Sequence, residues 1–285
     1  MTQYRTILAY IDDIATAADV LSFAFEIGKQ QGAHVQVLNA HGEPASTIPL
    51  VGEGMSATMV GEMIAMAETR QAERSMKLKQ VFGSIVTERN IPIATIPSAE
   101  EGFTVSWREE AGLEEDILAR AGRLVDLVVM ARPAPTADET AFLTLNAALM
   151  ETGRPLLLVP SAKPALGKTI ALFWNGSVEA SNAAAGALPF LERAQKVVVL
   201  SAAEETQTKP SDLLDYLAWR GIKATAHCFP VTGQAGPLLL EEAGKRGADM
   251  VVMGAYTHSR LRQFIMGGVT RYVLRTPTIP LLLNH

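Results

Sequence analysis

The residues with the clearest potential for chemistry lie near the end of the chain. Glycines lie there among hydroxyl, basic and apolar side chains. The candidate residues are Met253, Gly254, Thr257, Ser259, Arg260, Gly267, Gly268, Val269 and Thr270. A glycine directly after a strand allows a tight turn and close approach of a ligand. Paired glycines at a helix start leave N–H groups uncovered, and the helix dipole there favours an anion. The pattern predicts a phosphate site, although glycines can also serve only to pack the last helix tightly.

A second candidate group follows an earlier apolar run. Asn175 and Gly176 come directly after the strand expected at residues 169–173. In open parallel sheets, ligands bind beyond the carboxyl ends of the strands. We therefore expect Asn175 and Gly176 to lie at the same edge as the glycine-rich segment. Asp12 and Asp13 hold the corresponding place after the first strand of the chain.

The net charge of the chain and its distribution indicate which kinds of ligand it can bind. The net charge of −5 argues against a dedicated nucleic-acid binder, which is normally basic. Residues 1–160 carry 12 basic and 21 acidic side chains, whereas residues 250–285 contain four arginines and no acid. A local basic surface in an acidic protein suits a small anionic ligand, and a solvated basic helix face is the alternative.

Four apolar segments recur in the same order in the two halves of the chain. The pairs are 6–10 with 169–173, 35–40 with 197–202, 126–130 with 249–253, and 155–158 with 280–283. Short apolar runs of this kind are typical of strands covered on both faces. Helical patterns lie between them, for example at 15–31, 113–121, 178–194 and 235–246. The alternation predicts an α/β protein of two five-stranded parallel sheets with helices on both faces.

The first half carries about 40 extra residues, judged by the offset between its repeat segments. A helix is expected at about residues 59–82, with a stripe of methionines: Met59, Met63, Met66 and Met76. Helix packing is the expected role of this stripe, and an adaptable binding surface is the alternative. A strand is expected at 103–108. The single cysteine, Cys228, is expected in a strand with its side chain in the hydrophobic core. With one cysteine, the chain cannot form an internal disulfide.

The repeat and the terminal segment together resemble the universal stress protein family in its tandem-domain form. The nucleotide motif of that family is G-x2-G-x9-G-[ST]; here its first and third glycines match Gly254 and Gly267. Thr257 stands at the second glycine, and Gly268 at the hydroxyl position. The resemblance implies Rossmann-like domains at residues 1–160 and 161–285, paired internally through strands 156–159 and 281–283. It also implies further self-association.

The same resemblance implies ATP with Mg²⁺ as the ligand of the second domain. Three departures weaken that expectation. Thr257 brings a β-branched side chain to a position where a positive φ would be costly. Gly268 lacks a hydroxyl, and Asn175 stands where nucleotide-binding members carry an acidic residue near the base or ribose. In the first domain, Ala131, Phe142 and Leu143 match Gly254, Gly267 and Gly268, so we expect no phosphate site there.

Three functions stay open from the sequence. The first is a stress-response binding module for an adenine nucleotide; the second is a scaffold without nucleotide that binds an unidentified protein. The third is a slow ATP hydrolase, for which His258 is the only nearby candidate base, so no catalytic residue is assigned. No histidine–cysteine spacing indicates a metal site. We expect a cytoplasmic protein without a secretory signal or membrane span, since no apolar run approaches about 18 residues.

Overall fold

The computed structural model describes residues 3–42, 57–98, 102–133, 139–162, 166–202, 209–230, 234–255, 268–275 and 279–285. The strands are β1 (Thr6–Tyr10), β2 (His34–His41), β3 (Thr104–Ala111), β4 (Leu127–Ala131), β5 (Leu156–Val159), β6 (Thr169–Phe173), β7 (Lys196–Ser201), β8 (Ala224–Cys228), β9 (Met250–Gly254) and β10 (Leu281–Asn284). The helices are α1 (Ile14–Gln31), α3 (Ala57–Glu88), α4 (Glu114–Gly122), α5 (Glu139–Met150), α6 (Val178–Gly186), α7 (Leu188–Leu191), α8 (Pro210–Ala218), α9 (Ala235–Lys245) and α10 (Gly268–Arg275).

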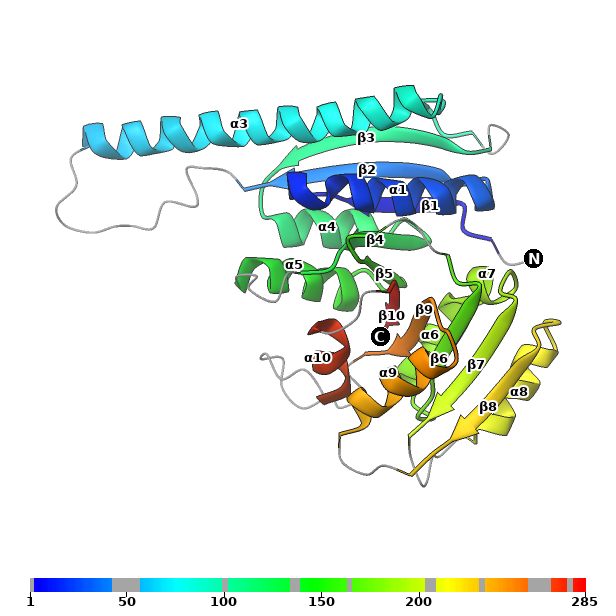
Figure 1. Cartoon of the computed structure of the whole chain (residues 1–285). Helices are drawn as coiled ribbons and strands as arrows, with labels where there is room; N and C mark the ends of the chain where they lie inside the picture. The colour runs from blue at the N-terminus through cyan, green and yellow to red at the C-terminus, as the bar shows by residue number, and fades with distance from the viewer. Residues whose placement is uncertain are drawn as a thin grey trace.

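All ten strands form one continuous sheet in the order β3-β2-β1-β4-β5-β10-β9-β6-β7-β8. Strands β1–β5 form the first half and β6–β10 the second, and pairing within each half is parallel. The alternating strands and helices therefore give the predicted fold class, two Rossmann-like α/β units in tandem (Figure 1).

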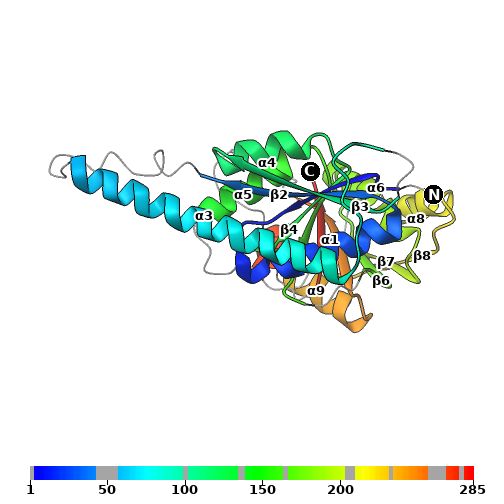
Figure 2. The same cartoon turned by 90° about the horizontal axis from the view of Figure 1, so that it is seen from above.

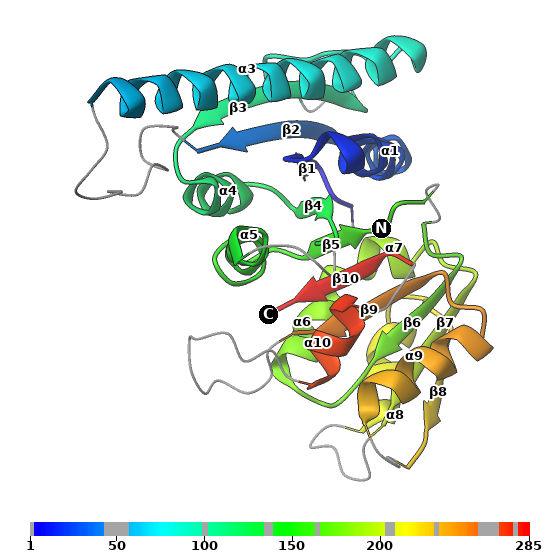
Figure 3. The ribbon, with the colours of Figure 1, turned by 60° about the vertical axis from the view of Figure 1, so that its left-hand side comes forward.

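The halves join through their last strands. β5 and β10 pair antiparallel, with Leu157 opposite Leu282 at the centre of the ladder. Figure 3 shows these two strands side by side between the halves. The predicted internal pairing through strands 156–159 and 281–283 is confirmed. Because the pairing is antiparallel, the strands of the two halves run in opposite directions, and their carboxyl edges face opposite ways.

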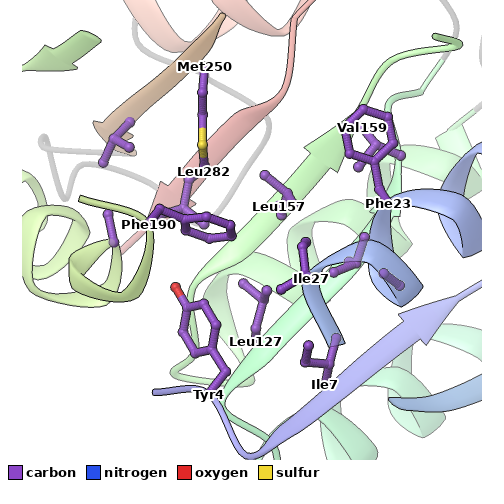
Figure 4. Packing of buried hydrophobic residues seen from close by; sticks show 14 of the residues in the cluster. Tyr4, Ile7, Phe23, Ile27, Leu127, Leu157, Val159, Phe190, Met250 and Leu282 are labelled. Carbon is purple, nitrogen blue, oxygen red and sulfur yellow. The ribbon is translucent and has the colours of Figure 1, made fainter. Parts of the chain in front are cut away.

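The helices cover both faces of the sheet. One buried cluster draws on α1, α3, α6, α7 and α8, and the other on α4, α5, α9 and α10. The first cluster contains residues of both halves, among them Leu127 and Leu157 of the first and Phe190 and Leu282 of the second; Figure 4 shows Leu157 beside Leu282. The Tyr4 ring meets the Phe190 ring edge-on with centroids 5.5 Å apart. The two halves therefore share one hydrophobic core on this face of the sheet.

Local sequence explains where α1 begins and ends. Asp13 is extended and accepts a hydrogen bond from the Ala15 amide at 3.0 Å, which caps the helix start. Gly32 follows Gln31 with a φ of 64°, the left-handed conformation that glycine adopts readily at a helix end. The predicted helix at 15–31 is confirmed.

The long helix α3 differs from expectation. It runs from Ala57 to Glu88, beyond the predicted 59–82, and its first half projects past the sheet (Figures 1 and 2). From Thr58 onward, the first buried side chain of α3 is that of Ser75. The prediction that the methionines pack against the domain is wrong, because all four side chains are exposed: Met59, Met63, Met66 and Met76.

Two smaller expectations also fail for physical reasons. The single helix predicted at 178–194 is two helices, α6 and α7, because Pro189 lacks the N–H that would continue the hydrogen-bond ladder. Cys228 is exposed rather than buried, because β8 is an edge strand with one neighbour, β7. Among the described residues, no helix is both long and apolar enough to cross a membrane.

Candidate functional site

The carboxyl edge of the second half brings two of the predicted groups together. β6 and β9 are neighbours, with Phe173 level with Met253. The turn after β6 contains Asn175 and Gly176, so it lies at the same edge as Gly254, the last residue of β9. The expectation that these residues share one edge of the sheet is confirmed.

The turn after β6 is shaped by local hydrogen bonds. The Asn175 side-chain oxygen accepts from the Ser177 amide at 3.2 Å, and Gly176 has a φ of 75°. Ser177 then caps α6, its hydroxyl accepting from the Ala180 amide at 3.2 Å. This geometry leaves the Asn175 side chain exposed at the edge while it fixes the direction of the backbone. Gly176 is needed here for its left-handed conformation.

Gly254 has a structural role that the sequence does not reveal. A Cβ atom at this position would lie 2.5 Å from the Ala180 amide nitrogen and 2.5 Å from the Glu179 carbonyl carbon. Real Cβ atoms essentially never come this close to backbone atoms. The glycine therefore lets the first turn of α6 pack against the end of β9. Close approach of a ligand is not required to explain it.

Several predicted site residues are buried. The Met253 side chain is 4% exposed and packs in the core, and Thr270 in α10 is 5% exposed. Val269 is partly buried against the same core. Gly268 is the first residue of α10. The side chains of Met253, Val269 and Thr270 thus face the domain interior.

The middle of the glycine-rich segment lies outside the described residues. This applies to Thr257, Ser259, Arg260 and Gly267. Their part in a phosphate site stays a prediction. Among the residues that the structure describes, no group of three histidine, cysteine, aspartate or glutamate side chains is arranged to hold a metal ion.

The C-terminal residues join this edge, which sequence reasoning missed. The His285 ring nitrogen lies 3.1 Å from the Ala255 carbonyl, just after β9. The Asn182 side chain donates to the His285 carbonyl at 3.1 Å, and the Asn284 side chain donates to the Asn182 carbonyl at 3.2 Å. Position was the only available signal, because β10 must end beside the end of β9 in a parallel pair.

The first half has a different edge at the equivalent place. The Ile11 amide donates to the Leu38 carbonyl and the Trp174 amide to the Leu200 carbonyl, which makes Ile11 and Trp174 structural equivalents. Asp12 therefore stands where Asn175 does. Burial, and then the nearby charge of Glu114, raise the pKa of the Asp12 carboxyl above its ordinary value, and Arg74 opposes them.

Helix α3 walls this edge of the first half with polar side chains. The fully buried Asn39 donates to the Ser75 hydroxyl at 2.6 Å, and Ser75 in turn contacts the Glu109 carboxylate. The His41 ring lies 3.6 Å from the same carboxylate. These contacts link the ends of β2 and β3 to the inserted helix. They give this edge of the first half an internal polar network.

The helices that precede the last strands also differ. Phe142 lies within α5, whereas the residue that it matches, Gly267, lies outside the described residues. Phe142 matches Gly267 in the repeat, and its partly buried side chain packs against the core. At Phe142 the first-half backbone is already helical, and an aromatic side chain occupies the position of a glycine.

Comparison with known proteins agrees with this geometry. The sequence model of the universal stress protein family matches residues 177–285, a range that includes Gly254, Gly267 and Gly268. No curated protein sequence matches the chain.

Solved structures share the fold over nearly the whole chain. A universal stress protein from Archaeoglobus fulgidus is 14% identical with a TM-score of 0.63, and the match covers 98% of this chain and 97% of that one. A functionally unknown protein from Pseudomonas aeruginosa is 17% identical with a TM-score of 0.57, covering 99% and 92%. Residues 177–285 thus match the universal stress protein family, and the chain as a whole shares the fold of these solved structures, with two Rossmann-like α/β units in tandem.

Proposed function

We propose that this protein is a stress-response binding module whose second domain, residues 161–285, binds an adenine nucleotide, ATP with Mg²⁺. The observation that carries the proposal is the family match over residues 177–285, since it spans the whole glycine-rich segment. The start of α10 at Gly268 supports it, because a helix that begins on glycine presents uncovered N–H donors to phosphate oxygens.

Each proposed ligand residue has a distinct part. The backbone at Gly267 and Gly268 would hold phosphate, with hydroxyl and guanidinium donors from Ser259 and Arg260. Asn175, exposed after β6, would hydrogen-bond the nucleoside. Bound Mg²⁺ would neutralise phosphate charge. The remaining predicted residues shape the surrounding backbone: Gly176, Met253, Gly254, Thr257, Val269 and Thr270.

The first domain, residues 1–160, has a structural or partner-binding role in this proposal. Phe142 in place of a glycine and the polar contacts between α3, β2 and β3 both support the absence of a phosphate site there. Self-association of the chain belongs to the same proposal. The edges left after internal pairing are β3 and β8.

Thermal unfolding with millimolar Mg-ATP, with AMP as the control ligand, tests the nucleotide proposal. A ligand at about 100 times its Kd stabilises by roughly 2.7 kcal/mol, which shifts Tm by several degrees. The Gly267→Phe variant, which copies the first half, should lose the shift, and the milder Ser259→Ala variant should reduce it. Leu143→Ala, at the exposed matching position of the first half, should keep it. A wild-type Tm that ATP leaves unchanged contradicts the proposal.

A scaffold without nucleotide is the second candidate, and the Gly254 contact favours it. If Gly254 serves α6 packing, its presence no longer requires a ligand. The same thermal measurement decides between the two functions. A slow ATP hydrolase is the third; phosphate release from Mg-ATP that is equal in wild type and His258→Ala would remove His258 from such a mechanism.

A further inference from the structure

A buried arginine connects the first half to the last helix of the second half. Arg132 follows β4, and its guanidinium donates through Nη1 to the Val273 carbonyl at 3.0 Å and through Nη2 to the Ile279 carbonyl at 3.1 Å. Val273 lies near the C-terminal end of α10, and only Pro280 separates Ile279 from β10. One side chain of the first half therefore bridges the connection from α10 to β10.

The charge of Arg132 is balanced by this helix end. Burial lowers the pKa of the Arg132 guanidinium to about 10, so the group still carries its charge at neutral pH. No ion pair among the described residues includes it. The last carbonyls of a helix carry partial negative charge and lack intrahelical partners. The end of α10 and the residue before β10 thus accept the Nη1 and Nη2 protons of Arg132, whereas its buried Nε has no hydrogen-bond partner among the described residues.

The sheet geometry gives this contact a direction. Because β5 and β10 are antiparallel, the carboxyl edge of the first half faces the opposite way from that of the second. In a βαβ crossover the helix runs back against its strands. α10 therefore starts at the carboxyl edge of the second half and ends at the carboxyl edge of the first. Arg132 donates hydrogen bonds at the C-terminal end of α10, and Gly268 is the first residue at its other end.

The contact is made in one direction only. The Arg132 amide donates to the Val159 carbonyl and the Ala255 amide to the Asn284 carbonyl, so these two residues are equivalent in the repeat. Ala255 has no side chain that could hold α5 in return. The end of α5 is instead bound by a residue of its own half: the Arg123 side chain donates a hydrogen bond to the Glu151 carbonyl at 3.0 Å. The end of α10 is held by the other half.

We propose that Arg132 is a positioning residue for the second domain: its hydrogen bonds to the Val273 and Ile279 carbonyls fix α10, and thereby set the affinity of the phosphate loop at the other end of that helix. The inference rests on the proposed nucleotide function for its second step. A protein whose competent conformation is only partly populated binds in proportion to that fraction. The first half would thereby act on nucleotide affinity through α10.

The test compares two variants that both remove contacts between the halves. Arg132→Met removes the contacts to α10, whereas Tyr4→Phe removes the hydrogen bond from the Tyr4 hydroxyl to the Gly186 carbonyl, at the end of α6. Amide hydrogen exchange of residues 268–275 in the full-length protein without ligand reports the order of α10. Calorimetric titration with Mg-ATP reports affinity. Arg132→Lys keeps the charge and part of the hydrogen bonding.

We expect Arg132→Met to raise amide exchange in α10 and to weaken Mg-ATP binding about tenfold. Arg132→Lys should recover part of both, and Tyr4→Phe should change neither. A merely structural arginine would lower Tm and leave Kd as in wild type, which overturns the proposal. If wild type does not bind Mg-ATP, the nucleotide function fails. In that case unchanged exchange in Arg132→Met rejects the positioning of α10 as well, whereas faster exchange confined to α10 upholds it.

Discussion

Gly254 lies directly against Ala180, so that a single added methyl group on Gly254 would fall 2.5 Å from the Ala180 amide nitrogen. The contact joins the end of β9 to the first turn of α6. Ala131 holds the same place in the first half and carries the methyl group that Gly254 lacks. The requirement for glycine is therefore specific to the second half, where α6 comes closer to the sheet.

The Gly254→Ala substitution should destabilise the protein. Overpacking against backbone atoms, which cannot rotate away, costs about 1–3 kcal/mol. Chemical denaturation measures this as a lower midpoint. The matched reverse change, Ala131→Gly, adds no contact and should cost only about 0.5–1 kcal/mol from backbone entropy. Equal denaturation midpoints for Gly254→Ala and wild type would contradict the packing role. Close approach of a ligand would then be the remaining explanation for Gly254.

Two helical glycines should respond to alanine in opposite ways. A Cβ at Gly28 in α1 would lie 2.7 Å from the Phe103 and Val35 side chains, whereas a Cβ at Gly244 in α9 would meet nothing within 4 Å. Gly28→Ala should lower the free energy of unfolding by about 1–3 kcal/mol. Gly244→Ala should raise it by about 0.5–1 kcal/mol through helix propensity. Denaturation midpoints of the two variants, measured side by side, check both signs.

Much of the fold could be predicted from the sequence because its strands are buried on both faces. The apolar repeats place β1, β2, β4 and β5 and their second-half counterparts, and Gly32 marks the end of α1. Contacts between distant residues carry no such local signal. The spacing of the methionines on α3 does not indicate that the helix extends beyond the sheet. Apolar residues repeat with the same helical period whether their face of the helix is covered or exposed.

The candidate site was predictable only in part for the same reason. The order of the elements places Asn175 and Gly254 at one edge, because parallel strands end together. The approach of α6 to Gly254 and the reach of Arg132 to Val273 depend on how helices pack across the sheet. A glycine that serves packing and one that serves a ligand have the same sequence pattern.

The Tyr4→Phe substitution should weaken the junction between the halves. The Tyr4 hydroxyl donates to the Gly186 carbonyl at 2.5 Å, and these residues are 182 positions apart. Removing the donor should lower the free energy of unfolding by about 1 kcal/mol, since a partly buried carbonyl loses its partner. Tyr216→Phe, which keeps the ring beneath Arg220, serves as the control and should leave the unfolding midpoint unchanged. A Tyr4→Phe midpoint equal to that of wild type would show that solvent replaces the donor.

Asp12 should make the stability of the protein depend on pH. Its folded-state pKa is raised, chiefly by burial and then by Glu114. A carboxyl with a raised pKa favours the folded state fully below its unfolded pKa, and this contribution is lost as pH rises through the folded pKa. Asp12→Asn keeps the shape without the charge. Its unfolding free energy should match that of wild type near pH 3 and exceed it increasingly at higher pH, up to a plateau above the folded pKa.

Urea unfolding of wild type and Asp12→Asn between pH 3 and pH 8 measures this difference. Repeating the pair in a Glu114→Gln background removes one of the two acidic neighbours, Glu114 and Asp13, that raise the pKa of Asp12. The gain from Asp12→Asn should then shrink, because Arg74 faces Asp12 with less opposition. A variant less stable than wild type at pH 7 would reverse the sign. It would mean that the Arg74 charge outweighs burial and holds the Asp12 carboxylate in its ionised form.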